Sequence, residues 1–220
     1  MEQHNDFEDL NKSTIYYRDL KKSEEYTFAE FDPVEKLKET PNMAMLITSK
    51  RRTGKSVLMK DLCQKIHKWY DQCYVFSMTA EYQPDLFNYV DEGCVYNSFD
   101  EDKLNEIWDT QKNHVLKIEA QGKKKEKDAN KIMILFDDVI SDPRVKKSEI
   151  LNRLAVMGRH IMIGYILISQ TITGVPPIIR TNADCAIAFY LDSCANRETY
   201  ASEYLSTESK RLGVMIFNKI

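Results

Sequence analysis

Three uninterrupted apolar runs constrain the fold of this 220-residue chain. They are Met43–Thr48 (MAMLIT), Ile132–Phe136 (IMILF) and Ile161–Ile168 (IMIGYILI). Each run has the length of a strand but lacks the alternation of apolar and polar residues that a strand with one solvated face shows. Strands of this kind are buried on both faces, as in parallel sheets covered by helices. We therefore expect an α/β protein with a largely parallel central sheet flanked by helices.

Weaker patterns predict further elements between these runs. We expect strands at 73–79 and 185–191, a short strand at 93–97, and helices at about 55–70, 101–120 and 148–157. Asp100 is the predicted N-cap of the helix at 101–120. The helix at 55–70 should pack on the sheet through an apolar stripe at three- and four-residue spacing: Val57, Leu58, Leu62, Ile66 and Trp69. The charged stretch 122–128 should interrupt the pattern.

The first part of the chain differs from the rest. Residues 1–27 are charged and show no sustained period, and residues 28–39 form a short amphipathic piece followed by Thr40 and Pro41. We therefore expect an N-terminal arm with a short amphipathic segment at 1–40, and one main domain at 41–220.

Composition excludes several classes of protein. The chain is 43% apolar and 30% charged, which suits a globular protein with a sizeable core. Its acidic first ten residues do not resemble a secretory signal, its longest apolar run is too short to span a bilayer, and its five cysteines form no C-x-x-C pair. We expect a cytoplasmic protein without a membrane segment. Because the net charge is −3, any contact with nucleic acid must come from local basic clusters.

A phosphate-binding loop is predicted between the first apolar run and the first helix. The segment Ser49-Lys-Arg-Arg-Thr-Gly-Lys-Ser56 matches G-x-x-x-x-G-K-[ST] except at its first position, where serine replaces glycine. In such a loop, backbone N–H groups and the positive end of the helix dipole converge on a phosphate. Lys55 would contact the β- and γ-phosphates and Ser56 would be a ligand of Mg²⁺. The predicted ATP-binding residues are Ser49, Lys50, Arg51, Arg52, Thr53, Gly54, Lys55, Ser56 and Val57.

Two acidic residues and one amide follow later strands. Asp137 and Asp138 come directly after the run at 132–136, and Gln170 follows the run at 161–168. Since parallel strands deliver their carboxyl ends to one edge of the sheet, these side chains should meet the phosphate loop there. We assign Asp137 to Mg²⁺ and Asp138 to deprotonation of the attacking water, although the two roles could be exchanged. Gln170 would hydrogen-bond both the γ-phosphate and that water.

Four segments together resemble a known family. They are ITSKRRTGKSVLMKDL, IMILFDDVISD, LAVMGRHIMIGYILISQT and PPIIRTNAD. They are similar to the genome-packaging ATPases of large nucleocytoplasmic DNA viruses, members of the FtsK/HerA superfamily of P-loop ATPases. The similarity runs from about Met43 to Leu191, and it departs from the family pattern at Ser49 and at Asp138.

The resemblance implies a fold, an activity and partners. It implies a RecA-like core, hydrolysis of Mg-ATP, and a homo-oligomeric ring of five or six subunits that moves double-stranded DNA into a viral capsid. It further implies contact with capsid or portal proteins, and a location at the assembly site in the host cytoplasm or in the virion. An arginine from a neighbouring subunit would complete each site, with Arg159 as first candidate and Arg180 as second.

Lysines near the sheet are the candidates for contact with DNA phosphates. They are Lys123, Lys124, Lys125 and Lys127 before the acidic strand, and Lys146 and Lys147 after it. Two other functions stay open. One is a monomeric P-loop enzyme such as a nucleoside or nucleotide kinase, whose arginine-rich lid is not evident in the sequence. The other is a nucleotide-binding scaffold without hydrolysis, against which the complete set of site residues argues.

Overall fold

The computed structural model describes residues 14–19, 22–27, 31–191, 193–205 and 210–217. The chain divides into two compact units, residues 1–33 and 34–220. In the first unit, strand β1 (Thr14–Asp19) pairs antiparallel with β2 (Lys22–Thr27), with Thr14 opposite Thr27. The sequence pattern predicts no regular element in this part of the chain. A two-stranded ribbon is held by backbone hydrogen bonds, which need no apolar period in the sequence.

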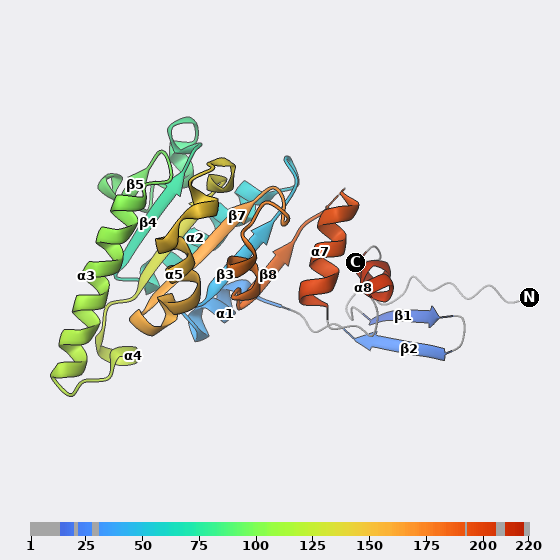
Figure 1. The fold of residues 1–220 in the computed structure, drawn as a ribbon, viewed down its shortest axis with the longest axis horizontal. Coiled ribbons are helices and arrows are strands. Elements are labelled where there is room, and N and C mark those ends of the chain that lie inside the picture. Colours follow the sequence, from blue (N-terminus) through green and yellow to red (C-terminus); the bar gives the residue numbers. More distant parts are fainter. Residues whose placement is uncertain (1–13, 20–21, 28–30, 192, 206–209, 218–220) are drawn as a thin grey trace, which may run out of the picture. The chain divides into compact units, whose positions relative to one another are not determined.

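The second unit is built on a six-stranded parallel sheet in the order β5-β4-β6-β7-β3-β8 (Figure 1). The strands are β3 (Ala44–Thr48), β4 (Gln72–Ser77), β5 (Val95–Tyr96), β6 (Ile132–Asp137), β7 (Ile163–Ser169) and β8 (Cys185–Ala188). The predicted α/β class with a parallel sheet is confirmed. Strands β6 and β7 are neighbours, and β7 also pairs with β3.

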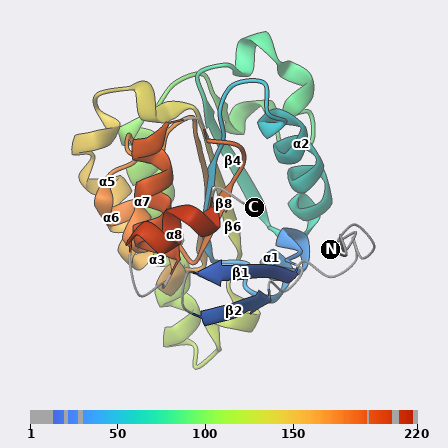
Figure 2. The ribbon, with the colours of Figure 1, turned by 90° about the vertical axis from the view of Figure 1, so that its right-hand side faces the viewer.

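Helices cover both faces of this sheet (Figure 2). The described helices are α1 (Pro33–Glu39), α2 (Lys55–Ile66), α3 (Glu101–Ala120), α4 (Lys125–Asp128), α5 (Glu149–Met157), α6 (Pro177–Thr181), α7 (Cys194–Tyr204) and α8 (Lys210–Phe217). Helices α1 and α2 pack on one face of the sheet, and α3, α5, α6 and α7 pack on the other. Alternate residues of a strand enter different cores: Leu46 packs in the cluster with α3 and α5, and Ile47 in the cluster with α1 and α2. This explains why the strands are apolar throughout.

Several predicted boundaries differ from the structure. Helix α2 ends at Ile66 and continues as a 3-10 turn, and its buried face includes Met59, Leu62 and Cys63. Val57, expected on that face, has 73% of its surface exposed because it lies in the first turn, at the open end of the helix. Strand β7 begins at Ile163 because Met162 has a left-handed backbone conformation (φ 61°). Strand β8 ends at Ala188, and the charged stretch contains the single turn α4.

Local signals place two helices as predicted. Asp100 caps α3 by accepting a hydrogen bond from the Lys103 N–H at 2.9 Å. The Ser148 hydroxyl caps α5 by accepting from the Leu151 N–H at 3.2 Å, and it donates to Glu101 on α3 at 2.7 Å. Helices α6, α7 and α8 are not predicted by the sequence pattern. In α7 the buried positions are few, so its sequence shows no clear apolar stripe.

Candidate active site

The loop between β3 and α2 has the conformation of a phosphate-binding loop. Gly54 (φ 97°) and Arg52 (φ 64°) are both in the left-handed region, and α2 begins immediately afterwards at Lys55. Among the described residues no side chain caps the helix, and its first turn has no acidic residue, so the positive end of its dipole has no anionic partner within the helix. Gly54 is exposed and has no atom closer than 3.8 Å to the position of a Cβ. The loop therefore fits an anion such as a phosphate.

Ser49 explains how the loop forms without its first glycine. Its backbone φ is not positive, so glycine is not required there, and the residue is fully buried. The Ser49 N–H donates to the Ser169 carbonyl on β7 at 3.0 Å. The Ser49 hydroxyl hydrogen-bonds Thr53, whose own hydroxyl donates to the Lys50 carbonyl at 2.7 Å. Serine thus ties the two ends of the loop together through its side chain.

Asp137 is a buried carboxylate at the end of β6. It is 4% exposed, and its Oδ2 accepts hydrogen bonds from the hydroxyls of Ser77 at 2.9 Å and Thr79 at 3.2 Å. Burial raises the pKa of the Asp137 carboxyl above its ordinary value, and the nearby Lys55 ammonium and the two hydroxyls offset only part of this effect. Sequence reasoning missed Ser77 and Thr79. Both lie at or just after the end of the apolar strand β4, which is the one signal in the sequence; that β4 lies beside β6 is seen only in the structure.

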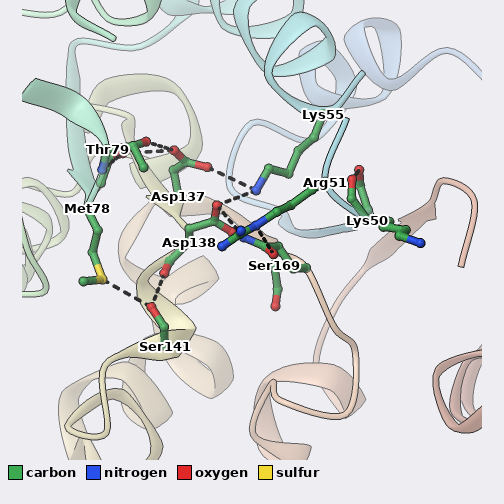
Figure 3. Close-up of polar contacts among 12 residues, drawn as sticks. Lys50, Arg51, Lys55, Met78, Thr79, Asp137, Asp138, Ser141 and Ser169 are labelled. Carbon is green, nitrogen blue, oxygen red and sulfur yellow. Dashed lines mark hydrogen bonds and ion pairs between the residues drawn. The ribbon is translucent and has the colours of Figure 1, made fainter. Parts of the chain in front are cut away.

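Asp138 follows in a left-handed conformation (φ 55°), which aspartate tolerates better than most residues. Its Oδ2 is 2.7 Å from the Lys55 ammonium, and the same ammonium is 3.9 Å from Oδ1 of Asp137 (Figure 3). Lys55 is therefore the shared cation of both carboxyl groups, and its side chain is only 11% exposed. The predicted meeting of the phosphate loop with the acidic pair is present in the structure.

Gln170 joins the same cluster from the end of β7. Its amide nitrogen donates to Oδ2 of Asp138 at 3.2 Å, and its amide oxygen accepts from Nε of Arg51 at 3.1 Å. Asp138 Oδ2 is thus bonded by Lys55 from α2 and by Gln170 from β7. Three neighbouring elements supply one connected set of polar side chains at the carboxyl edge of the sheet.

The donors at this edge suit a divalent cation of the magnesium type. Ser56 lies partly buried in the first turn of α2, and Asp137 has a second oxygen that faces Lys55 rather than a hydroxyl. Hydroxyl and carboxylate oxygens are the ligands that Mg²⁺ prefers, with phosphate oxygens and water completing its shell. Among the described residues, no group of three or more His, Cys, Asp or Glu side chains could hold a metal ion without such outside ligands. Lys50 and Val57 are exposed at the rim of the loop.

The two arginines expected to act between subunits have different surroundings. Arg159 is exposed in the turn before β7, at the opposite edge of the sheet from the phosphate loop, where its carbonyl accepts from the Asn42 amide at 2.8 Å. Arg180 in α6 pairs with Glu203 at 3.0 Å, and it donates to the Ile172 carbonyl at 3.3 Å. The structure does not bring either residue to the Lys55 cluster of its own chain.

The lysines proposed for DNA contact do not form one patch. Lys123–Lys127 precede the start of β6, and Lys146 and Lys147 follow its end. At about 3.3 Å per residue the two groups are separated by roughly 20 Å along the strand. Figure 1 shows α4 at the end of the sheet away from the arrowheads. Only Lys146 and Lys147 share an edge with the phosphate loop.

Comparison with known proteins places this arrangement in a family. The family described as the poxvirus A32 protein matches residues 29–214. The chain belongs to the poxvirus A32 family. No curated protein sequence matches it. Among the described residues of this family member, no helix is both long and apolar enough to cross a bilayer.

Solved structures share the fold of this A32 family member. The genome packaging NTPase B204 of Sulfolobus turreted icosahedral virus 2, solved with AMPPCP, is 19% identical with a TM-score of 0.56; the match covers 79% of this chain and 87% of B204. The pCW3 conjugation coupling protein TcpA, solved with ATPγS, is 12% identical with a TM-score of 0.58; the match covers 95% of this chain and 62% of TcpA. The resemblance to viral genome-packaging ATPases is confirmed.

Proposed function

We propose that the protein is an ATP-hydrolysing motor that moves double-stranded viral DNA into a capsid. One observation carries the proposal: Lys55, Asp137, Asp138 and Gln170 converge beside an uncapped helix N-terminus. Membership of the A32 family and the fold shared with B204, a genome packaging NTPase, support the same function.

Binding of ATP would begin with an exchange of partners at Lys55. The β- and γ-phosphates carry more charge than one carboxylate, so the ammonium moves from Asp138 to the phosphates. Asp138 is then released from its shortest described hydrogen bond, 2.7 Å long, and its carboxylate is left to accept a hydrogen bond from water. Loop residues 52–56 bind phosphate oxygens through backbone N–H groups and through the Lys55 side chain.

Hydrolysis then requires in-line attack by one water molecule. The water oxygen bonds to the γ-phosphorus, the bond from that phosphorus to the ADP oxygen breaks, and the water proton passes to the Asp138 carboxylate. Gln170 keeps its hydrogen bond with Asp138 and can orient the water through the same amide. Ser56 and Asp137 would hold Mg²⁺, which neutralises charge on the phosphates when bound.

Ring assembly and the partners are further parts of this proposal. We infer a homo-oligomeric ring of five or six subunits, double-stranded DNA as the translocated substrate, and a capsid or portal protein as the docking partner at the assembly site in the host cytoplasm or in the virion. Arg159 is the first candidate for an arginine that acts between subunits, because it is exposed whereas Arg180 is engaged by Glu203.

The test is ATPase activity of the full chain with Mg²⁺, with and without long duplex DNA. We expect hydrolysis that duplex DNA stimulates, and Asp138→Asn should bind ATP while its turnover falls by at least about 10²-fold. Asparagine is a suitable replacement because it also accepts the left-handed conformation at this position. Absence of hydrolysis by the wild-type protein, with or without DNA, would refute the proposal.

A further inference from the structure

Arg51 has a contact that its place in the phosphate loop did not predict. Its Nε–H donates to the amide oxygen of Gln170, directly after β7, at 3.1 Å. Figure 3 shows the Arg51 side chain extending from the loop toward Asp138, on the side occupied by the Lys55 ammonium. This bond links the loop after β3 directly to the residue that follows β7.

The bond determines which way the Gln170 amide faces. A glutamine side chain has an acceptor end and a donor end of almost equal size, so packing alone scarcely distinguishes its two orientations. Arg51 is only a donor and the Asp138 carboxylate is only an acceptor. The oxygen of Gln170 must therefore face Arg51, and the nitrogen must face Asp138, where the structure has it 3.2 Å from Oδ2.

An inverted amide would disable the site. Its oxygen would face the Asp138 carboxylate, so two acceptors would oppose each other and the attacking water would lose a defined partner. Once Lys55 has turned to the phosphates, Gln170 is the remaining described side chain that donates to the Asp138 carboxylate. Arg51 is the described residue that fixes this amide from its other end.

We propose that Arg51 is a positioning residue that acts within its own subunit by orienting Gln170 toward Asp138. This inference rests on the proposed ATPase function. Arg51 thereby differs from Arg159 and Arg180, which could act only across a subunit boundary. The other donors of its guanidinium have no partner among the described residues, so Arg51 can keep Gln170 in place while the loop holds a phosphate.

A double-mutant cycle tests the positioning role. The rates of wild type, Arg51→Ala, Gln170→Ala and the double variant are measured with saturating Mg-ATP, and the affinity for a non-hydrolysable ATP analogue is measured for each. We expect Arg51→Ala to lower kcat about 100-fold, as displacement of a catalytic group does, while the analogue still binds. The double variant should be no slower than Gln170→Ala, because both changes remove the same function.

Controls separate positioning from charge and from folding. Arg153→Ala removes an exposed arginine of α5 whose guanidinium lies over Trp108 of α3 rather than at the Lys55 cluster, and its rate should match wild type. Arg51→Lys keeps the positive charge but lacks the planar guanidinium whose Nε–H donates to Gln170. Its rate should therefore lie between those of Arg51→Ala and wild type. Additive losses in the double variant, or a wild-type kcat for Arg51→Ala, would overturn the proposal.

Mixed oligomers test whether Arg51 acts within its subunit. Subunits with Arg51→Ala are combined with subunits with Asp138→Asn, and neither kind then has a complete set of residues in its own site. No recovery of hydrolysis is expected, and recovery would overturn action within one subunit. If wild type itself does not hydrolyse ATP, the proposed function fails as well, whereas an active wild type with an unaffected Arg51→Ala variant refutes this inference alone.

Discussion

At the scale of single residues, the site is arranged around one cation that two carboxyl groups share. Lys55 lies between Asp137 and Asp138, and all three side chains are mostly shielded from water. A buried charge is costly to leave without a partner, so each of the three depends on the others. Replacing one of them should therefore change both the binding of nucleotide and the behaviour of the remaining two.

Lys55→Ala should reduce ATP affinity by about 100-fold or more, equivalent to one charge-assisted hydrogen bond of about 3 kcal/mol. The same change leaves two adjacent carboxylates without their shared cation, so the melting temperature should also fall at neutral pH. Titration with a fluorescent ATP analogue and a thermal melt measure the two effects. Wild-type affinity in this variant would contradict the assignment of the phosphate loop.

The raised pKa of Asp137 predicts a specific pH dependence of stability. Because folding raises this pKa, the Asp137 carboxyl contributes to the free energy of unfolding of the wild-type protein. This contribution is complete below the ordinary aspartate pKa and is lost as pH rises through the folded value. Asp137→Asn carries no charge, so without nucleotide or metal its melting temperature relative to wild type should increase over that window and then level off. Thermal melts from about pH 3 to about pH 8 measure the difference.

Asp142 provides the matched control. Hydrogen bonds from Arg144 lower the pKa of this carboxyl. Its contribution to the free energy of unfolding is therefore complete above the ordinary aspartate pKa and is lost as pH falls through the folded value. The melting temperature of Asp142→Asn relative to wild type should therefore decrease as pH rises. Equal pH trends for the two variants would contradict the opposite environments described for the two residues.

At the scale of elements, strand β7 is fixed by a close approach of backbone. A Cβ on Gly164 would lie 2.4 Å from the Pro41 carbonyl oxygen and 3.1 Å from Cα of Asn42. Backbone atoms cannot move aside as a flexible side chain can, so the segment before β3 packs here only because residue 164 is glycine. This contact positions the segment before β3 against β7, the strand that ends just before Gln170.

Gly164→Ala should lower the free energy of unfolding by about 1–3 kcal/mol, the usual cost of inserting a methyl group into a packed interior. Gly93→Ala is the control, because nothing lies within 4 Å of its Cβ position and its φ is not in the left-handed region. Its effect should stay within about 0.5 kcal/mol. Urea denaturation of both variants measures the difference, and equal stabilities would refute the packing argument.

Some features of these elements could be predicted from the sequence and others could not. The apolar runs predicted the parallel sheet because burial on both faces leaves a direct trace in composition. The exposure of Val57 was not predicted, since the end of a helix beyond the sheet has the same local pattern as its middle. The bonds of Arg51 with Gln170 and of Ser77 with Asp137 depend on strand order, which no local pattern records.

At the scale of the whole molecule, the two lysine groups can be tested separately because they lie at opposite edges of the sheet. Replacing Lys146 and Lys147 together, or Lys123, Lys124 and Lys125 together, by alanine should weaken binding of duplex DNA if the group binds phosphates. The slope of log K against log salt should become shallower by about 0.9 for each DNA phosphate that the variant no longer neutralises. We expect both sets to contribute, and unchanged affinity and slope for either set would remove it from the interface.

Mixing experiments extend the test to subunit boundaries. Arg159→Ala subunits and Asp138→Asn subunits should together recover some of the hydrolysis that neither shows alone, because a guanidinium from one subunit would complete the intact site of its neighbour. The result expected for Arg51 is the opposite. No recovery in oligomers shown to be mixed would count against Arg159, and the same mixture would then be made with Arg180→Ala.

The pairing of β3 has a consequence for synthesis on the ribosome. Met45 lies between Ile166 on β7 and Cys185 on β8, so both neighbours of the strand that carries the phosphate loop come from late in the chain. While the first half emerges, this apolar strand has no partner and its edges are open to other chains. A nascent chain stalled before β7 should thus neither bind ATP nor resist protease at β3, and it should be a substrate for chaperones.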